Sequence, residues 1–389
     1  MKIRTLVVAC LAFQITAGHT VAQDDSVFIA FGDSITLAEP RFDEQRRMGY
    51  VGRLQSKLRG TDPDATVHNF GRNSETTAEG LSRLSFVLQT PSDAIIIMEG
   101  TNDITDVADG LISFESVGSN LAAMGSRAGS AGRHVYYATV IPRPPWARRD
   151  KTNLLTFALA REIRGIAFRQ QRELVDPFDV LRHIPGAYDA LYHTGTDSVG
   201  HPNAAGFSVM ADAFFDSVRG VDSQGPVPAE FLPVPGSSPT IKPANDIEIL
   251  LYDFGEGLDT SNATITINGI PVATDSSGNS NQLTLTHDTT KASLGCYARI
   301  GVQASDLADP PNVSDHAYWE FRVEGGQLLN SDLDKSCRVD GADMLFVAYG
   351  FGSQDGQSRY TKFADLNQDG KIDGMDLAMI AADFGRTSS

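Results

Sequence analysis

The stretch Val27-Phe28-Ile29-Ala30-Phe31-Gly32-Asp33-Ser34 decides the fold class of the N-terminal half. Its five consecutive apolar residues predict a short buried strand, and Gly-Asp-Ser ends that strand in a turn. Residues 35–37 then enter a helix. A serine at this place would expose its hydroxyl at the open edge of a sheet, where it could act as a nucleophile. Taken alone, Gly-Asp-Ser is an ordinary turn.

Strand-like and helical patterns alternate through the rest of this half. Further apolar runs at 94–98 and 134–140 predict buried strands. Helical patterns lie near residues 45–59, 76–88, 111–127, 152–173 and 203–218. Strands that alternate with helices indicate a parallel sheet covered on both faces. In such folds the functional site lies beyond the carboxyl ends of the strands.

Three more short blocks follow the predicted strands or precede the last helix. They are Asn69-Phe70-Gly71, Gly100-Thr101-Asn102-Asp103 and Asp197-Ser198-Val199-Gly200-His201-Pro202-Asn203. Together with Gly-Asp-Ser, they make residues 26–219 resemble the SGNH (GDSL-type) hydrolases, which are marked by Ser, Gly, Asn and His in four ordered blocks. The resemblance implies a three-layer, doubly wound α/β (flavodoxin-like) domain, which we place at residues 23–222.

The resemblance also implies a role for each block in acyl transfer. Ser34 is the expected nucleophile, and His201 is the general base that removes its proton. The backbone N–H groups of Ser34 and Gly71 and the side-chain amide of Asn102 are the expected oxyanion donors. No cofactor is expected for catalysis.

The block around His201 departs from the pattern of the family. The orienting acid usually stands three residues before the histidine, but that position holds Ser198, and Asp197 lies four residues before it. Either Asp197 reaches the imidazole through a longer loop, or a backbone carbonyl orients the ring. We favour Asp197.

Composition excludes several other classes of protein. The chain of 389 residues has a formal net charge of −17. Residues 23–219 carry 20 basic and 25 acidic side chains, and residues 220–389 carry 10 and 24. Nucleic-acid binding needs clustered Lys and Arg, and an anionic membrane surface would repel this charge. Neither partner is expected.

The first 22 residues have the features of an export signal. Lys2 and Arg4 form the charged start, residues 6–13 are apolar, and Thr20-Val21-Ala22 provides a small-residue cleavage site. No later run approaches the ~18 apolar residues of a membrane span. We therefore expect a secreted, extracellular or periplasmic protein without a transmembrane segment. Its two remaining cysteines, Cys296 and Cys337, either form one disulfide or stay as buried thiols.

The pattern changes after the hydrolase-like part. Prolines are frequent at 226–239, and we expect residues 223–243 to be a Pro-rich linker. Alternating runs such as 263–269 and 318–323, separated by turns, then predict a β-sandwich at 244–325. This part is similar to the Ig-like modules that accompany exported bacterial enzymes.

The tail holds an internal repeat with an offset of 33 residues, in which 332–343 matches 365–376. Both copies resemble the calcium loops of dockerin-type or EF-hand-like modules, so we expect a small helical pair at 328–389. Oxygen ligands at alternate positions of a loop suit Ca²⁺. The expected ligands are Asp332, Asp334, Ser336, the Arg338 carbonyl, Asp340 and Asp343 in the first copy, and Asp365, Asn367, Asp369, the Lys371 carbonyl, Asp373 and Asp376 in the second. Cys337 replaces the turn glycine of the first copy, which makes that loop the weaker candidate.

These features predict a multidomain, exported serine esterase that removes acyl groups from a carbohydrate or a lipid. Its C-terminal helices either dock on a partner protein or cap the sandwich. The competing interpretation is a non-catalytic surface or assembly protein whose hydrolase domain has decayed. Intact motif blocks favour the enzyme, whereas the shifted Asp197 and the acidic C-terminal half fit the rival.

Overall fold

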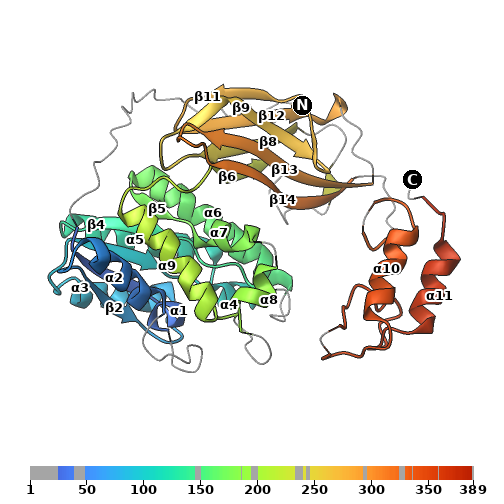
Figure 1. Ribbon diagram of the computed structural model, residues 1–389, viewed down its shortest axis with the longest axis horizontal. Coiled ribbons are helices and arrows are strands. Elements are labelled where there is room, and N and C mark those ends of the chain that lie inside the picture. Colours follow the sequence, from blue (N-terminus) through green and yellow to red (C-terminus); the bar gives the residue numbers. More distant parts are fainter. Residues whose placement is uncertain are drawn as a thin grey trace.

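The computed structural model describes residues 25–38, 49–144, 150–184, 186–193, 200–232, 240–241, 246–291, 296–323, 329–334, 336–357 and 359–387. Figure 1 shows three parts along the chain: an α/β domain, a pair of mainly antiparallel sheets above it, and two helices at the C-terminus. The predicted signal segment at 1–22 lies outside the described residues. None of the described helices is long and apolar enough to cross a membrane.

The α/β domain is built on one fully parallel sheet, as the sequence predicts. Its strands are β1 (Val27–Gly32), β2 (Thr66–Gly71), β3 (Ala94–Met98), β4 (His134–Ala138) and β5 (Glu173–Val175), in the order β2-β1-β3-β4-β5. This is the doubly wound, flavodoxin-like order. The order reverses between β1 and β3, and the rule for such sheets places the site at the carboxyl ends of these two strands.

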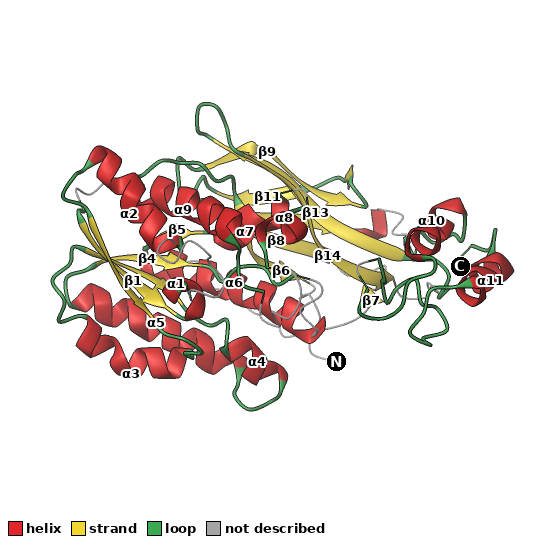
Figure 2. Ribbon diagram, turned by 60° about the horizontal axis from the view of Figure 1, so that its bottom comes forward, coloured by secondary structure: helices red, strands yellow, loops and turns green. Residues whose placement is uncertain are grey.

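Helices cover both faces of this sheet (Figure 2). One face is covered by α1 (Ser34–Leu37), α2 (Tyr50–Thr61), α7 (Pro177–His183), α8 (Ala187–Leu191) and α9 (Ala204–Val218). The other is covered by α3 (Thr77–Val87), α4 (Asp103–Ala108), α5 (Phe114–Ser130) and α6 (Asp150–Gln170). Alternation along the strands explains the two cores: Phe28 and Ala30 of β1 face the first set, whereas Ile29 and Phe31 face the second.

The second part is a β-sandwich. One sheet has the order β10-β9-β13-β14-β7 and the other β11-β12-β8-β6. Their apolar side chains share one buried cluster, which places the two sheets face to face. The strands are β6 (Val227–Leu232), β7 (Thr240–Ile241), β8 (Asp246–Tyr252), β9 (Leu258–Ile267), β10 (Ile270–Pro271), β11 (Asp275–Gly278), β12 (Gln282–Asp288), β13 (Tyr297–Asp306) and β14 (Val313–Val323), with a short turn of helix η1 (Thr289–Lys291).

The expectation of a simple linker at 223–243 is wrong for part of that segment. Residues 227–232 form β6, which pairs with β8, and residues 240–241 form β7, which pairs with β14. Proline is tolerated here because β6 is an edge strand with an irregularity between Pro228 and Glu230. The boundary between the two domains is therefore folded into the sandwich.

The sandwich packs directly on the α/β domain through α6. The ring of Phe231 on β6 lies 5.7 Å from that of Phe157, and the Arg161 guanidinium lies 4.8 Å over the Phe231 ring. The fully buried Arg164 donates to Asp176 Oδ2 at 2.7 Å and to the Pro228 carbonyl at 2.9 Å. Asp176 compensates the buried charge of Arg164. The bond to the Pro228 carbonyl links α6 to the sandwich.

The third part is a small pair of helices, α10 (Gly341–Gly350) and α11 (Gly374–Asp383). Each begins at an aspartate that caps its first turn, Asp340 and Asp373, and each has a reciprocal capping aspartate three residues later. Val339, Val347, Ala364, Ile372 and Ile380 form a separate buried cluster between them. The internal repeat therefore corresponds to two equivalent loop–helix units.

Candidate active site

Ser34 and His201 meet at the carboxyl edge of the parallel sheet. Ser34 Oγ and His201 Nε2 lie 2.9 Å apart, although 167 residues separate them in sequence. Both side chains are about 5% exposed. A serine hydroxyl within hydrogen-bond distance of an imidazole nitrogen is the arrangement that general-base activation of a nucleophile requires.

The backbone around Ser34 is fixed by its neighbours. Asp33 caps α1 because its Oδ1 accepts a hydrogen bond from the Ile35 N–H at 2.8 Å. Gly32 has no room for a side chain, since a Cβ there would lie 2.4 Å from the Met98 carbonyl oxygen of β3. The serine therefore stands on a tight turn between β1 and α1.

His201 is positioned by the residue that begins α9. Asn203 Oδ1 caps α9 by accepting from the Ala205 and Gly206 N–H groups, while its Nδ2 donates to the Ala190 carbonyl at 2.9 Å. The His201 carbonyl also accepts from the His193 N–H at 3.1 Å. These bonds fix the loop that carries the imidazole against α8. Asp197 and Ser198 lie outside the described residues, so the choice of orienting group stays a prediction.

Gly71 is required by a close approach of two backbones. A Cβ at this position would lie 2.1 Å from the Leu37 nitrogen at the end of α1. The Gly71 N–H donates to Asn69 Oδ1 at 2.8 Å, and Asn69 Nδ2 donates to the Thr36 carbonyl at 2.9 Å. An oxyanion bound by Gly71 would therefore take the place of Asn69 Oδ1 as acceptor.

Asn102 stands at the start of α4, beyond the end of β3. Its Nδ2 donates to the Glu75 carbonyl at 2.7 Å. Because an amide nitrogen carries two hydrogens, this bond orients the group and leaves a second donor. Asp103 accepts from the Thr77 N–H at 2.9 Å and from its hydroxyl at 2.6 Å, so it braces the loop between β3 and α4.

Arg83 joins the Gly71 and Asn102 segments, and sequence reasoning missed it. From α3, its Nε donates to Glu75 Oε1 at 2.6 Å, and its Nη2 donates to the Phe70 carbonyl at 2.8 Å and to Glu75 Oε2. Its guanidinium also lies 4.2 Å over the Phe31 ring. One side chain thus holds the residue before Gly71 and the residue whose carbonyl orients Asn102. No motif marks this pair, because Glu75 and Arg83 meet only through the turn into α3.

Buried carboxyl groups lie behind the Ser34 turn. Burial raises the pKa of Asp33 to about 6, against the opposing effect of the Ile35 N–H. Burial, the nearby Asp33 carboxylate and Glu75 raise the pKa of Glu99 well above its usual value. Neither carboxyl oxygen of Glu99 has a hydrogen-bond partner within the described part of the chain. Glu99 therefore resists ionisation at the end of β3.

The C-terminal repeat brings carboxylates together. Asp332, Asp334 and Asp343 each offer an oxygen within 4.8 Å of the others, and Asp332 Oδ1 is buried without a hydrogen-bond partner among the described residues. This oxygen-rich set fits Ca²⁺. The grouped carboxylates lie in the first loop, which the sequence ranked as the weaker one. In the second loop, Asp376 Oδ1 accepts hydrogen bonds from the Leu366 and Asn367 N–H groups.

Cys337 explains how the first loop forms without its glycine. It adopts φ of +72°, the left-handed conformation that Gly370 adopts in the second loop at +85°. Its N–H donates to Asp332 Oδ2 at 2.9 Å. Cys337 also forms a disulfide with Cys296 at the start of β13, so of the two possibilities left by the sequence the bridge is the one observed. The bridge ties the first loop to the sandwich.

Two regions of the chain match known protein families. Residues 30–209 match the GDSL-like Lipase/Acylhydrolase family, and residues 330–384 match the Dockerin type I domain. None of the curated proteins compared with the chain matches it.

Several solved structures resemble the α/β half. A lipase/acylhydrolase from Enterococcus faecalis is 20% identical with a TM-score of 0.42, covering 50% of this chain and 95% of its own. An α/β hydrolase from the Lake Arreo metagenome is 22% identical with a TM-score of 0.42, covering 51% and 97%. An acetylxylan esterase from Geobacillus stearothermophilus is 20% identical with a TM-score of 0.41, covering 50% and 94%.

The family matches, rather than these distant likenesses, identify the two regions. The first spans β1 to α9 and includes Ser34 and His201. The second spans both acidic loops and both C-terminal helices. Residues 30–209 are therefore a GDSL-like lipase/acylhydrolase domain, a carboxylic ester hydrolase, and residues 330–384 of the same chain are a dockerin type I domain.

Proposed function

We propose that this protein is an exported serine esterase that cleaves acyl esters through an acyl-enzyme on Ser34. The observation that carries the proposal is the 2.9 Å contact between Ser34 Oγ and His201 Nε2 at the carboxyl edge of the sheet. A decayed hydrolase domain would have no need to keep this contact, and the competing non-catalytic interpretation is therefore disfavoured.

The proposed reaction has two halves. In the first, Ser34 Oγ attacks the ester carbonyl carbon while its proton passes to His201 Nε2, and the tetrahedral intermediate expels the alcohol, which takes that proton. In the second, water gives a proton to His201 and its oxygen attacks the acyl-serine. Collapse releases the carboxylic acid, and the proton returns to Ser34. Asp197 is the proposed group that orients His201.

The negative oxygen of each intermediate needs donors that are arranged in advance. We assign them to the Ser34 N–H, the Gly71 N–H and Asn102 Nδ2. Arg83 supports this arrangement as a positioning residue, because it holds the Phe70 carbonyl and, through Glu75, the carbonyl that orients Asn102. It does not touch the reacting atoms.

The remaining parts suit work outside the cell. The predicted signal segment and the disulfide fit an oxidising compartment. We propose that the dockerin domain binds a protein partner and that its two loops hold Ca²⁺, through the residues named above for each copy. The proposed substrate class is an acyl ester of a carbohydrate or a lipid.

The test is esterase activity of the full chain toward p-nitrophenyl acetate, with acetate and long-chain acyl esters compared to define the acyl group. Ser34→Ala is expected to abolish turnover without changing the melting temperature, and a fluorophosphonate is expected to add once, on Ser34. Labelling at another residue, or full activity of Ser34→Ala, would contradict the proposal.

A further inference from the structure

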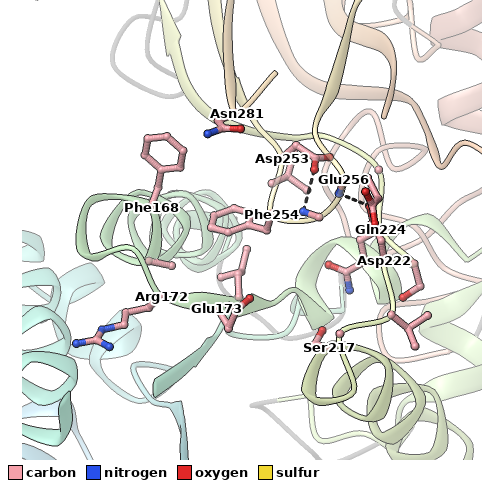
Figure 3. Close-up of a pocket in the computed structure, with 18 of the residues that line it drawn as sticks. Phe168, Arg172, Glu173, Ser217, Asp222, Gln224, Asp253, Phe254, Glu256 and Asn281 are labelled. Atoms are coloured by element: carbon pink, nitrogen blue, oxygen red, sulfur yellow. Dashed lines mark hydrogen bonds between the residues drawn. The ribbon is translucent and has the colours of Figure 1, made fainter. Parts of the chain in front are cut away.

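A cavity of about 460 Å³ lies at the junction between the α/β domain and the sandwich. Its walls come from the end of α6 and β5, from residues 217–227, and from the sandwich loop 253–256 together with Asn281 (Figure 3). None of Ser34, Gly71, Asn102 and His201 lines it. Its size falls within the ~300–1,000 Å³ range of small-molecule sites, which occur preferentially at domain interfaces.

One wall of this junction cavity is made of aromatic rings that pack against one another. Phe168 stacks on Tyr252 with ring centroids 3.9 Å apart and planes 3° from parallel. Phe254 meets Phe168 edge-on at 6.4 Å and Tyr252 edge-on at 6.3 Å. Phe168 and Phe254 line the cavity. Phe168 belongs to α6 of the α/β domain, whereas Tyr252 ends β8 of the sandwich and Phe254 follows it. The apolar wall therefore forms only where the two domains meet.

The other walls carry polar groups of both kinds. Three buried atoms of lining residues have no hydrogen-bond partner among the described residues: the donors Arg172 Nε and Gln224 Nε2, and the acceptor Asp253 Oδ2. Asp253 is only 8% exposed, and its other oxygen accepts from the Gly255 and Gly257 N–H groups. Buried polar atoms in native proteins usually have a partner. Figure 3 shows Arg172 pointing away from the cavity, so the wall offers one unused donor, on Gln224, and one unused acceptor, on Asp253.

This mixture discriminates between ligand classes. A metal ion would need several acceptors converging on one point, and within the described residues the only such group of His, Cys, Asp or Glu is Asp332, Asp334 and Asp343. An anion would meet Glu173, Asp222, Asp253 and Glu256 in the lining. A sugar ring offers hydroxyls that both donate and accept, and an apolar face that packs on an aromatic ring.

We propose that the junction cavity is a binding site for a neutral sugar unit, separate from the ester-cleaving site. The unit would pack against Phe254 and exchange hydrogen bonds with Gln224, Asn281 and Asp253. Since its walls come from two domains, the site exists only in the assembled pair. It would hold a saccharide chain on the enzyme without taking part in bond cleavage.

The experiment measures binding by the full chain carrying Ser34→Ala, so that its result does not depend on esterase activity. The probes are xylobiose, cellobiose and maltose, titrated to about 10 mM, well above a Kd of ~1 mM, with chemical shifts or calorimetry as readout. At least one disaccharide is expected to bind saturably. Gln224→Ala and Phe254→Ala are each expected to weaken its binding at least fivefold, whereas Phe86→Ala, which removes an exposed phenylalanine on α3, should not.

Three results would overturn the proposal. One is that no disaccharide binds, and another is that binding is unchanged in both cavity variants. The third is that tetramethylammonium binds at the cavity and the sugars do not, which would assign it to cations. Asn281→Ala, a change at a half-buried position, provides a second polar variant if Phe254→Ala lowers the melting temperature.

Discussion

Arg83 holds both of the segments to which we assign oxyanion donors, and this makes a specific kinetic prediction. Arg83→Lys keeps the charge, but one ammonium group cannot bond both Glu75 oxygens and the Phe70 carbonyl as the guanidinium does. Loosening both donor segments should lower kcat by about 10- to 100-fold, while KM changes less than ~2-fold, because the effect falls on the transition state. Inhibition by a boronic acid, which mimics the tetrahedral intermediate, should weaken in parallel.

The matched control for this change is Arg127→Lys on α5. Arg127 makes an exposed bond to the Leu81 carbonyl at 3.3 Å and touches neither donor segment. Its replacement should leave kcat and inhibitor affinity unchanged. A purely structural role for Arg83 would instead lower the melting temperature and leave the kcat of the folded fraction intact.

Glu99 gives a second prediction at the residue scale, in the pH dependence of stability. Its pKa is raised in the folded state by burial, by Asp33 and by Glu75, so the native protein binds more protons here than the unfolded chain does. The free energy of unfolding then falls as pH rises above the unfolded-state pKa. Glu99→Gln removes this titration. The melting temperature of Glu99→Gln minus that of the parent should become more positive between pH 5 and pH 9.

A calorimetric pH series checks this expectation. A constant difference across the series would show that Glu99 ionises equally in both states. Asp109→Asn is a suitable control, because it changes an exposed carboxyl group at the end of α4 rather than a buried one. Its difference from the parent should stay flat across the same range.

At the scale of elements, the sequence predicted the helices and strands whose periodicity is strong and whose caps are local. The patterns at 76–88, 111–127 and 203–218 correspond to α3, α5 and α9. It missed β5, which begins at the last residue of the helical pattern at 152–173, because a three-residue strand following a long helix has no period of its own. It also missed β6, because prolines mask a strand whose partner β8 lies beyond the Pro-rich segment.

Some residues of the candidate site could likewise be predicted from local sequence patterns, whereas others depend on contacts between distant segments. Ser34, Asn102 and His201 stand beside strand ends or helix starts, which local patterns mark. Glu75 and Arg83 come together only in the folded chain, and their spacing in the sequence does not predict the hydrogen bond between them. The disulfide was equally beyond sequence, since pairing depends on the 5.7 Å approach of two Cα atoms from different domains.

The two acidic loops predict a calcium stoichiometry of one ion for each loop. Asp334→Ala should remove the ion of the first loop and leave that of the second, while Asp369→Ala should do the reverse, because each change deletes one oxygen ligand. Elemental analysis of the dialysed protein measures the stoichiometry. Asp355→Ala, at an exposed aspartate outside both loops, is the control and should keep the parental value. An unchanged ratio in either loop variant contradicts the assignment for that loop.

At the scale of the molecule, the α/β domain and the sandwich should unfold together. Phe231 is 2% exposed and belongs to one cluster with Phe157 and Phe178 of the α/β domain. Phe231→Ala should cost about 3–5 kcal/mol of stability and lower the melting temperature by ~2–4 °C for each kcal/mol. Fluorophosphonate labelling of the α/β domain should be lost at the same temperature at which the β-sandwich unfolds. Leu232→Ala, at a neighbouring position 52% exposed, should have little effect.

The Cys296–Cys337 bridge has a mechanical consequence. If the dockerin domain is anchored and the hydrolase is pulled, tension leaves the first acidic loop through the bridge and enters the start of β13, bypassing the intervening chain. That chain separates the cysteines by 41 positions, and unbridged and fully extended it would span about 140 Å at ~3.4 Å per residue. The bridge therefore keeps β14, and the sandwich sheet that depends on it, out of the load path of an anchored enzyme.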